Sequence, residues 1–188
     1  MARFGLFALL LAALFFSPVH AQDKNPVVVM DTSLGKIRIE LDAKSAPITV
    51  KNFLDYVDDK FYDGTLFHRV LPDFMIQGGG FEPGLKEKRT KDQIKNESAN
   101  GLSNMRGSIA MARLPQPDTA TAQFFINVVD NKRLDGSKDK AGYAVFGKVV
   151  EGLDVVDKIR RVETADQGGN EAVPVKDVII RSIRRETK

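Results

Sequence analysis

The sequence predicts a mainly β protein, a closed barrel of short strands with a helix near each end of the chain. Two observations predict this fold. The apolar, β-rich segments beyond residue 25 are short, and loops rich in Gly, Pro, Asn and Asp separate them. Only two segments repeat their apolar residues with the spacing of a helix. Because periodicity does not reveal whether the strands close, a β-sandwich stays open as the alternative.

The first predicted element is a β-hairpin. Residues 27–30 are β-rich, and residues 37–41 alternate apolar and charged side chains. Residues 33–36, Ser-Leu-Gly-Lys, form the turn between them. Alternation of this kind places one face of a hairpin in the core and the other in solvent.

A helix is predicted next. Ser45 is the candidate cap, and Pro47 suits the first turn because the N–H that proline lacks would have no partner there. The apolar face of this helix consists of Val50, Phe53, Leu54 and Val57.

The remaining elements follow a turn at residues 62–64. Strands are predicted at 65–70, 74–77, 108–112, 124–128, 143–150 and 178–183. A second helix is predicted at 153–161, before the last of these strands. No internal repeat, low-complexity segment or interdomain linker divides the chain.

The N-terminus has the pattern of a secretory signal peptide. Arg3 is followed by an apolar run at residues 4–16, a break at Ser17-Pro18 and a cleavage position at Ala21/Gln22. The alternative is a membrane anchor, but the run is shorter than the ~20 residues of a spanning helix. We therefore expect residues 1–21 to be a signal peptide and residues 22–188 to form one domain of an exported protein. No later apolar stretch is long enough to span a bilayer, so no membrane association is expected once the signal is removed.

Composition and charge exclude several classes of function. The chain has no cysteine, which excludes disulfides, thiol nucleophiles and Cys-ligated metals. Its net charge is +3, and the charges are well mixed except at the C-terminal arginines from Arg181 onward. Because a nucleic-acid-binding protein needs a basic stripe with aromatic residues, we interpret that end as solvated and expect no nucleic acid partner.

Residues with the chemistry for metal, nucleotide or hydrolytic sites are scarce. Beyond the signal peptide the only histidine is His68, too few for a His-ligated zinc site, and no Gly-x-Ser-x-Gly motif is present. Gly78-Gly79-Gly80 lacks the rest of a phosphate-binding motif and is interpreted as a tight turn. Asp58, Asp59 and Asp63 are interpreted as a helix end and turn. We expect no metal and no cofactor.

An unusual mixture of apolar and uncharged polar residues remains. Residues 67–70 and 74–79 lie close together, and residues 111–113 and 123–127 repeat the mixture of Phe, Met, Gln and Arg. On a regular strand Phe67 and Arg69 would share a face, with His68 on the other. Core packing explains the Phe and Met residues, but a guanidinium such as that of Arg69 needs partners when buried.

These segments resemble the cyclophilins, which are peptidyl-prolyl cis-trans isomerases. The resemblance rests on Phe-His-Arg-Val-x-x-x-Phe-Met-Ile-Gln-Gly-Gly at 67–79, Met-Ala-Arg at 111–113 and Gln-Phe-Phe-Ile-Asn at 123–127. It continues with Leu-Asp-Gly at 134–136 and Val-Phe-Gly-Lys-Val at 145–149. It covers residues 26–183. Together with the export signal, it is strongest to the periplasmic cyclophilins of Gram-negative bacteria, which implies a periplasmic location.

The resemblance implies an eight-stranded antiparallel barrel capped by two helices, with the substrate groove on the outside. It implies that Arg69 is the catalytic residue, with His68 accessory. Residues implied to line the proline pocket are Phe74, Met75, Phe125 and Leu134, with Tyr143 where many relatives carry a pocket histidine. Residues implied to bind the peptide backbone are Gln77, Ala112, Arg113 and Gln123.

The implied substrates are proline-containing segments of exported polypeptides, and we expect a monomer. One alternative is a peptide-binding chaperone on the same fold with little isomerase activity. Another is a barrel that holds a small ligand inside, although the bulky apolar residues favour a filled core. Arg133 stands where many relatives have Trp, a residue that contributes to binding cyclosporin, so weak cyclosporin binding is expected. The charged loop at 135–141 also departs from the smallest relatives.

Overall fold

The predicted hairpin opens the fold. The structure, a computed structural model, describes Met1 and residues 25–186. Strand β1 (Val27–Thr32) pairs antiparallel with β2 (Gly35–Leu41), and Val28 lies opposite Ile39. Both of these side chains are fully buried. The alternating pattern therefore gives one face to the core and one to solvent.

The strands close into a barrel. Its order is β1-β12-β3-β4-β8-β7-β9-β2, and every neighbouring pair is antiparallel. The remaining barrel strands are β3 (Thr65–Leu71), β4 (Met75–Gly78), β7 (Ser108–Met111), β8 (Phe124–Asn127), β9 (Val145–Glu151) and β12 (Ile179–Arg185). The eight-stranded antiparallel barrel is confirmed, and closure excludes the sandwich.

Bulky side chains fill the barrel interior. Phe53 is fully buried, and its ring lies 5.2 Å from Tyr62, 5.8 Å from Phe124 and 5.2 Å from Phe146 between ring centroids. The two helices, α1 (Pro47–Asp58) and α2 (Leu153–Ile159), pack their buried faces into the same cluster of side chains. This interior is a packed core, as the bulky residues predicted, which disfavours a ligand held inside the barrel.

Helix α1 begins at Pro47 as predicted, but its cap is not Ser45. The N-cap residue is Ala46, and Ser45 instead donates to Asp42 through its Oγ, at 3.0 Å. Glu97, from a distant loop, accepts hydrogen bonds from the backbone N–H groups of Ile48 at 3.1 Å and Thr49 at 2.7 Å. A carboxylate there satisfies free N–H groups and complements the helix dipole.

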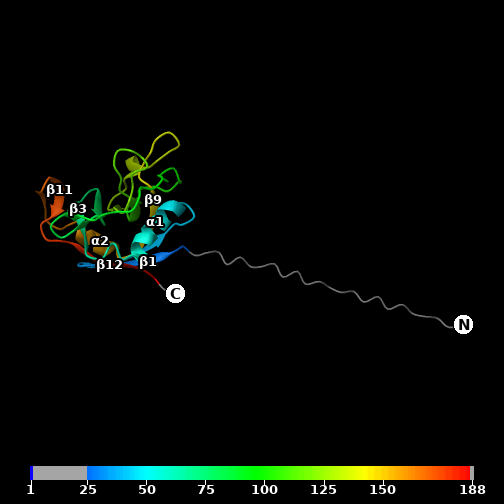
Figure 1. The fold of residues 1–188 in the computed structure, drawn as a ribbon, viewed down its shortest axis with the longest axis horizontal. Helices are drawn as coiled ribbons and strands as arrows, with labels where there is room; N and C mark the ends of the chain where they lie inside the picture. Colours follow the sequence, from blue (N-terminus) through cyan, green and yellow to red (C-terminus); the bar gives the residue numbers. More distant parts are fainter. Residues whose placement is uncertain (2–24, 187–188) are drawn as a thin grey trace.

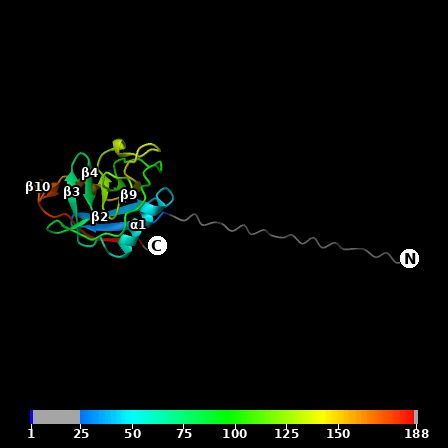
Figure 2. The ribbon, with the colours of Figure 1, turned by 45° about the horizontal axis from the view of Figure 1, so that its top comes forward.

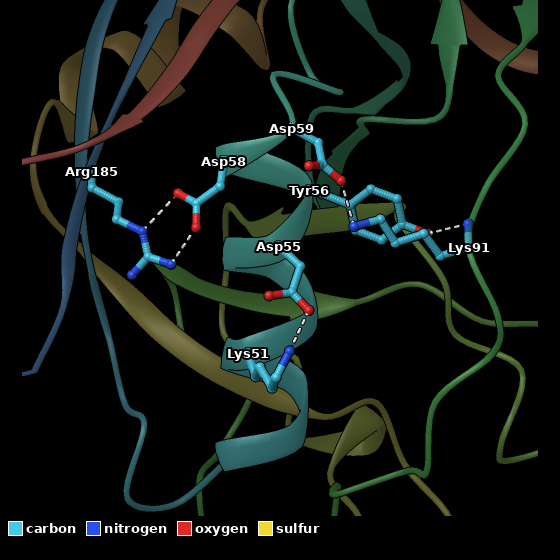
Figure 3. A network of polar contacts seen from close by, with 7 residues as sticks. All are labelled: Lys51, Asp55, Tyr56, Asp58, Asp59, Lys91 and Arg185. Carbon is cyan, nitrogen blue, oxygen red and sulfur yellow. Dashed lines mark hydrogen bonds and ion pairs between the residues drawn. The ribbon is translucent and has the colours of Figure 1, made fainter.

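Ion pairs attach the outer face of α1 to neighbouring segments (Figure 3). Asp58 binds Arg185 of β12 through two contacts, at 2.8 and 2.6 Å. Lys91 pairs with Asp59 at 2.5 Å, and its backbone N–H donates to the Tyr56 hydroxyl at 2.8 Å. Asp58 and Asp59 therefore lie at the C-terminal end of α1, as expected from the sequence.

The C-terminal arginines belong to a barrel strand. Strand β12 continues through Arg185, two residues beyond the predicted end. Arg184 binds Asp63 at 2.7 and 2.5 Å, and Arg181 lies 3.7 Å from Asp31. These side chains are open to solvent, as expected from the sequence, and they also pair with carboxylates on adjacent elements.

Sequence periodicity missed three short elements. These are the hairpin of β10 (Thr164–Gln167) and β11 (Asn170–Pro174), the hairpin of β5 (Phe81–Glu82) and β6 (Lys86–Glu87), and the 3₁₀ turn η1 (Lys132–Leu134). They contain few alternating apolar residues, so periodicity gave no signal. The β10–β11 hairpin lies beside β3 in both views (Figures 1 and 2).

The predicted signal peptide lies outside the described residues, apart from Met1, so its processing stays a prediction. Among the helices that the structure describes, none is long and apolar enough to cross a membrane.

Candidate active site

A β-bulge places Arg69 on the outer face of the barrel. In the β3–β4 pair, Phe67 lies opposite Gly78 and Arg69 opposite Gln77, with a register shift between them. Phe67 therefore belongs to the interior core, whereas Arg69 is partly exposed. The expectation that these two residues share a face was wrong, because the extra residue of a bulge reverses the alternation.

Beside Arg69 lies a second apolar cluster, separate from the interior core. It combines outward-facing residues of neighbouring strands with residues of the η1 loop. Its buried members are Met75, Ala110, Phe125 and Val145, and its partly buried members are Leu71, Phe74, Leu102, Ala112, Leu134 and Tyr143. Strand alternation separates this outer cluster from the interior core. Ile76 and Ile126 pair in register and point into the barrel, so their neighbours Met75 and Phe125 point outward.

This outer cluster forms one side of a hollow of about 160 Å³. The hollow is lined by Arg69, Phe74, Met75, Gln77, Ala112, Arg113, Phe125, Leu134 and Tyr143. The structure thus brings together nine side chains that the sequence proposed as one site. Larger hollows lie elsewhere, of about 400 Å³ near Val175 and about 320 Å³ near Leu102. Neither combines an arginine with aromatic walls, so we favour the smaller hollow.

Gln123 joins the site through a hydrogen bond. The Nε2 of Gln77 donates to the Oε1 of Gln123 at 2.9 Å. The glycine run makes room for this pair, because a Cβ on Gly80 would lie 2.5 Å from the Cγ of Gln123. Gly79 has a φ of +83°, which favours glycine. The run is therefore a turn after β4, as interpreted from the sequence.

Arginine side chains lie over two of the three aromatic residues that line the hollow. The guanidinium carbon of Arg113 lies 4.6 Å from the centroid of the Tyr143 ring, and that of Arg133 lies 4.8 Å from the centroid of Phe74. Arg113 is fixed further by donating to four backbone carbonyls, those of Gly142, Leu114, Pro115 and Ala141. Attraction between a cation and a ring face stabilises such stacks.

A chain of buried polar side chains supports two walls of the hollow. Asn131 Nδ2 donates to the carbonyl of Phe74 at 2.8 Å and to Asn127 Oδ1 at 2.7 Å. Asn127 donates in turn to Asn104 Oδ1 at 3.1 Å, and Asn104 donates to Asp135 Oδ1 at 3.0 Å. The network connects Phe74 to the loop of Leu134. Sequence analysis missed it, although three Asn residues and one Asp within or near the motifs were the available signal.

Asp135 anchors the far end of this network. It accepts hydrogen bonds from the backbone N–H of Asn104 at 2.7 Å and from the hydroxyl of Ser103 at 2.5 Å. Burial alone would raise the pKa of Asp135, but these hydrogen bonds outweigh it and lower the pKa. The carboxylate therefore stays ionised at neutral pH and directed inward.

Arg69 has an acidic partner that the sequence did not reveal. Its Nη2 lies 2.7 Å from Oε2 of Glu171, which belongs to the β10–β11 hairpin. The next residue, Ala172, has a φ of +53°, and its N–H donates to Asp166 at 3.1 Å. Within residues 25–186, the other guanidinium N–H groups of Arg69 have no hydrogen-bond partner. These donors are available to a bound molecule.

His68 does not line the hollow. Its side chain is 5 % exposed, and its ring lies 4.5 Å from that of Phe81. Burial, aided by the charge of Arg69 and opposed by backbone hydrogen bonding at Leu66, lowers the pKa of His68 to about 4. The imidazole is therefore neutral at physiological pH and cannot serve as a proton carrier near pH 7.

The burial of His68 predicts a loss of stability in mild acid. Its folded pKa lies below the usual value of about 6.5, so the unfolded chain takes up a proton first. The free energy of unfolding should be independent of this group above pH 7. It should fall between about pH 6.5 and 4, by up to about 3 kcal/mol.

Urea unfolding between pH 7.5 and 4.5 measures this effect, with His68→Leu as the comparison. The variant should lack the slope between pH 7 and about 5.5, where carboxylates of ordinary pKa remain almost fully ionised. An equal slope in both proteins would contradict the assignment.

Comparison with known proteins agrees with this geometry. Residues 27–185 match the family described as cyclophilin type peptidyl-prolyl cis-trans isomerase/CLD. The chain belongs to the cyclophilin family. This cyclophilin is 55 % identical over 177 residues to a peptidyl-prolyl cis-trans isomerase of Acinetobacter baylyi, covering 94 % of this chain and 93 % of the relative. It is 56 % identical over 160 residues to peptidyl-prolyl cis-trans isomerase B of Escherichia coli K12, covering 84 % and 98 %.

A solved structure supports the same family. The cyclophilin type isomerase of Cryptosporidium parvum, determined in the presence of the dipeptide Ala-Pro, superposes with a TM-score of 0.75 at 26 % identity. The match covers 86 % of this chain and 99 % of that one. As a member of this family, the present cyclophilin is an isomerase of X-Pro peptide bonds.

Proposed function

We propose that this cyclophilin accelerates X-Pro rotation by holding the proline ring in the hollow beside Arg69. The observation that carries the proposal is that one hollow is lined by both an arginine with free donors and a wall of Phe, Met and Leu side chains. In the relative from Cryptosporidium parvum, crystals were studied with the dipeptide Ala-Pro, which fits a proline-binding site.

Arg69 is the catalytic residue in this proposal. An amide bond resists rotation by ~18–20 kcal/mol because resonance gives it double-bond character. A hydrogen bond from the guanidinium to the prolyl nitrogen favours the pyramidal nitrogen of the twisted state and weakens the resonance. Since the guanidinium stays charged at any ordinary pH, Arg69 needs no titrating partner. Each ~1.4 kcal/mol removed from the barrier accelerates rotation about tenfold.

The other residues position the substrate. Phe74, Met75, Phe125 and Leu134 hold the proline ring, with Tyr143 at the edge, while the preceding acyl group rotates. The pocket also excludes water, which strengthens the contact with Arg69. Gln77, Ala112, Arg113 and Gln123 bind the peptide backbone, and none of them needs to exchange a proton. His68 is accessory: it packs behind Arg69 rather than touching substrate.

We also propose that the substrates are exported polypeptides in the periplasm. The N-terminal pattern of a signal peptide supports this location, since residues 4–16 form a short apolar run after Arg3. Polypeptides that fold after export expose their X-Pro bonds there. These bonds interconvert over tens to hundreds of seconds without a catalyst, so an isomerase shortens a slow folding step.

The test is the rate of a proline-limited peptide isomerisation with the purified protein, measured from pH 6 to 9. We expect fast catalysis with little pH dependence, because neither Arg69 nor the buried His68 changes protonation there. A steep change in the catalysed rate near pH 6.5 that arises from the enzyme and not from the substrate would contradict the mechanism. An inactive protein that still binds unfolded chains would favour the peptide-binding chaperone.

A further inference from the structure

The rim of the hollow carries more positive charge than its own carboxylates balance. Three arginines lie there: Arg69 and Arg113 line the hollow, and Arg133 lies over Phe74, which also lines it. Glu171 compensates Arg69, at 2.7 Å. Within residues 25–186, the other two arginines form no ion pair with a carboxylate.

Within residues 25–186, Arg113 has hydrogen-bond partners but no counter-charge. All four of its acceptors are backbone carbonyl oxygens, which fix the guanidinium without neutralising it. Its stack on Tyr143 holds the charge at the edge of the hollow. Fixed orientation reduces the entropy that a bound anion would otherwise cost the side chain.

Arg133 has neither an acceptor nor a counter-charge in the described part of the chain. Its side chain is exposed, and it makes no ion pair within 4.0 Å among residues 25–186. The nearest carboxylate in sequence, Asp135, is directed inward to Ser103 and Asn104. Asp73, adjacent to Phe74, makes no ion pair with Arg133 either.

A guanidinium stacked on a ring keeps its edge free. The guanidinium carbon of Arg133 lies over the ring of Phe74, and within residues 25–186 its N–H groups make no hydrogen bond, so they remain available to a molecule bound beside the ring. An arginine edge matches a carboxylate, which can accept two parallel hydrogen bonds.

We propose that Arg133, assisted by Arg113, makes this cyclophilin prefer proline segments that carry an Asp or Glu close to the proline. The proposal rests on the proposed function, because the hollow must hold the proline. Arg133 is then a specificity-determining residue and takes no part in the rotation itself. Exposed ion pairs contribute about 0.2–1 kcal/mol, which corresponds to a preference of about 1.4- to fivefold for the acidic peptide.

Matched peptides that differ only by Glu or Gln test the preference, with the exchange placed in turn before and after the proline. The ratio of kcat/KM for Glu over Gln should be about 1.4 to 5 at low salt, mainly through KM. It should approach one at high salt, because salt screens exposed charges. In Arg133→Gln the ratio should approach one at low salt as well.

Lys36→Gln is the matched control. It removes one exposed positive charge from β2, which lies opposite β4 in the order of the closed barrel. The Glu preference should be unchanged in this variant. If it falls equally in Lys36→Gln and Arg133→Gln, net charge explains it and the proposal is wrong. A ratio near one in the unmodified protein at every position also overturns it.

Direct binding separates this proposal from the proposed function. Affinities for the Glu and Gln peptides are measured by calorimetry with the same three proteins. Tighter binding of the Glu peptide that depends on Arg133 supports the specificity even if no isomerisation occurs, an outcome that would reject the proposed function alone. Isomerisation of the Gln peptide with equal affinities for both peptides would reject the specificity alone.

Discussion

Replacing Arg69 by alanine should reduce kcat/KM for proline isomerisation on the order of 10²–10³-fold, by analogy with the loss of a donor that stabilises a transition state. The change removes the only charged group of the hollow that the mechanism directs at the prolyl nitrogen. The kcat/KM of Arg69→Lys should lie between those of the unmodified protein and Arg69→Ala. Lysine keeps the positive charge but lacks the planar guanidinium that also binds Glu171. Proline-limited peptide assays on the three proteins measure the effect.

The stability of these variants provides the control. The side chain of Arg69 is 34 % exposed, and its ion pair with Glu171 is open to solvent. Such pairs contribute about 0–1 kcal/mol, so urea unfolding of Arg69→Ala should stay close to that of the unmodified protein. Undiminished activity in a folded Arg69→Ala protein would remove Arg69 from the mechanism while leaving the isomerase intact.

Replacing Asn127 by alanine should lower the free energy of unfolding by about 3 kcal/mol or more. Asn127 is fully buried, accepts from Asn131 and donates to Asn104 and to Ser108 Oγ at 2.9 Å. The substitution deprives three buried groups of a partner, and each such loss costs about 1–3 kcal/mol. Because the network fixes Phe74 and the Leu134 loop, we also expect a raised KM. Urea unfolding and peptide kinetics measure the two effects.

Ser108→Ala is the comparison for this prediction. It removes one acceptor of Asn127, while the bonds to Asn104 and Asn131 remain, so a loss of only about 1 kcal/mol is expected. The double variant should cost less than the sum of the single changes, because both remove the same hydrogen bond. Equal losses in Asn127→Ala and Ser108→Ala would show that the network does not act as a unit.

Local patterns were sufficient for most of the barrel and for the composition of the site. The alternation in β2 and the helical spacing in α1 each act over a few neighbouring residues, so they can be read along the chain. The order of the motif segments identified the family and nine residues that line one hollow. Their roles in binding proline remain predictions that the experiments above test.

Contacts between distant parts of the chain could not be predicted in this way. Glu97 accepts a hydrogen bond from Ile48, which lies 49 residues earlier in the first turn of α1. Glu171 pairs with Arg69, which lies 102 residues away. Neither glutamate carries a local pattern that distinguishes it from a solvated one. The partners of the basic C-terminal strand could not be predicted for the same reason, since Asp58 and Asp63 reach it only in the folded protein.

The sequence by itself determined the short strands and the two helices, because hydrophobic periodicity is a property of the chain. The motif order, through its resemblance to the cyclophilins, implied the closed barrel and the candidate site residues. Only the tertiary structure decided which way Arg69 points, since a single bulge in β3 reverses the face of every residue beyond it. It also decided the charge of the rim. Whether an arginine is compensated depends on which carboxylates the fold brings near it, and the fold brings Glu171 to Arg69 but turns Asp135 away from Arg133.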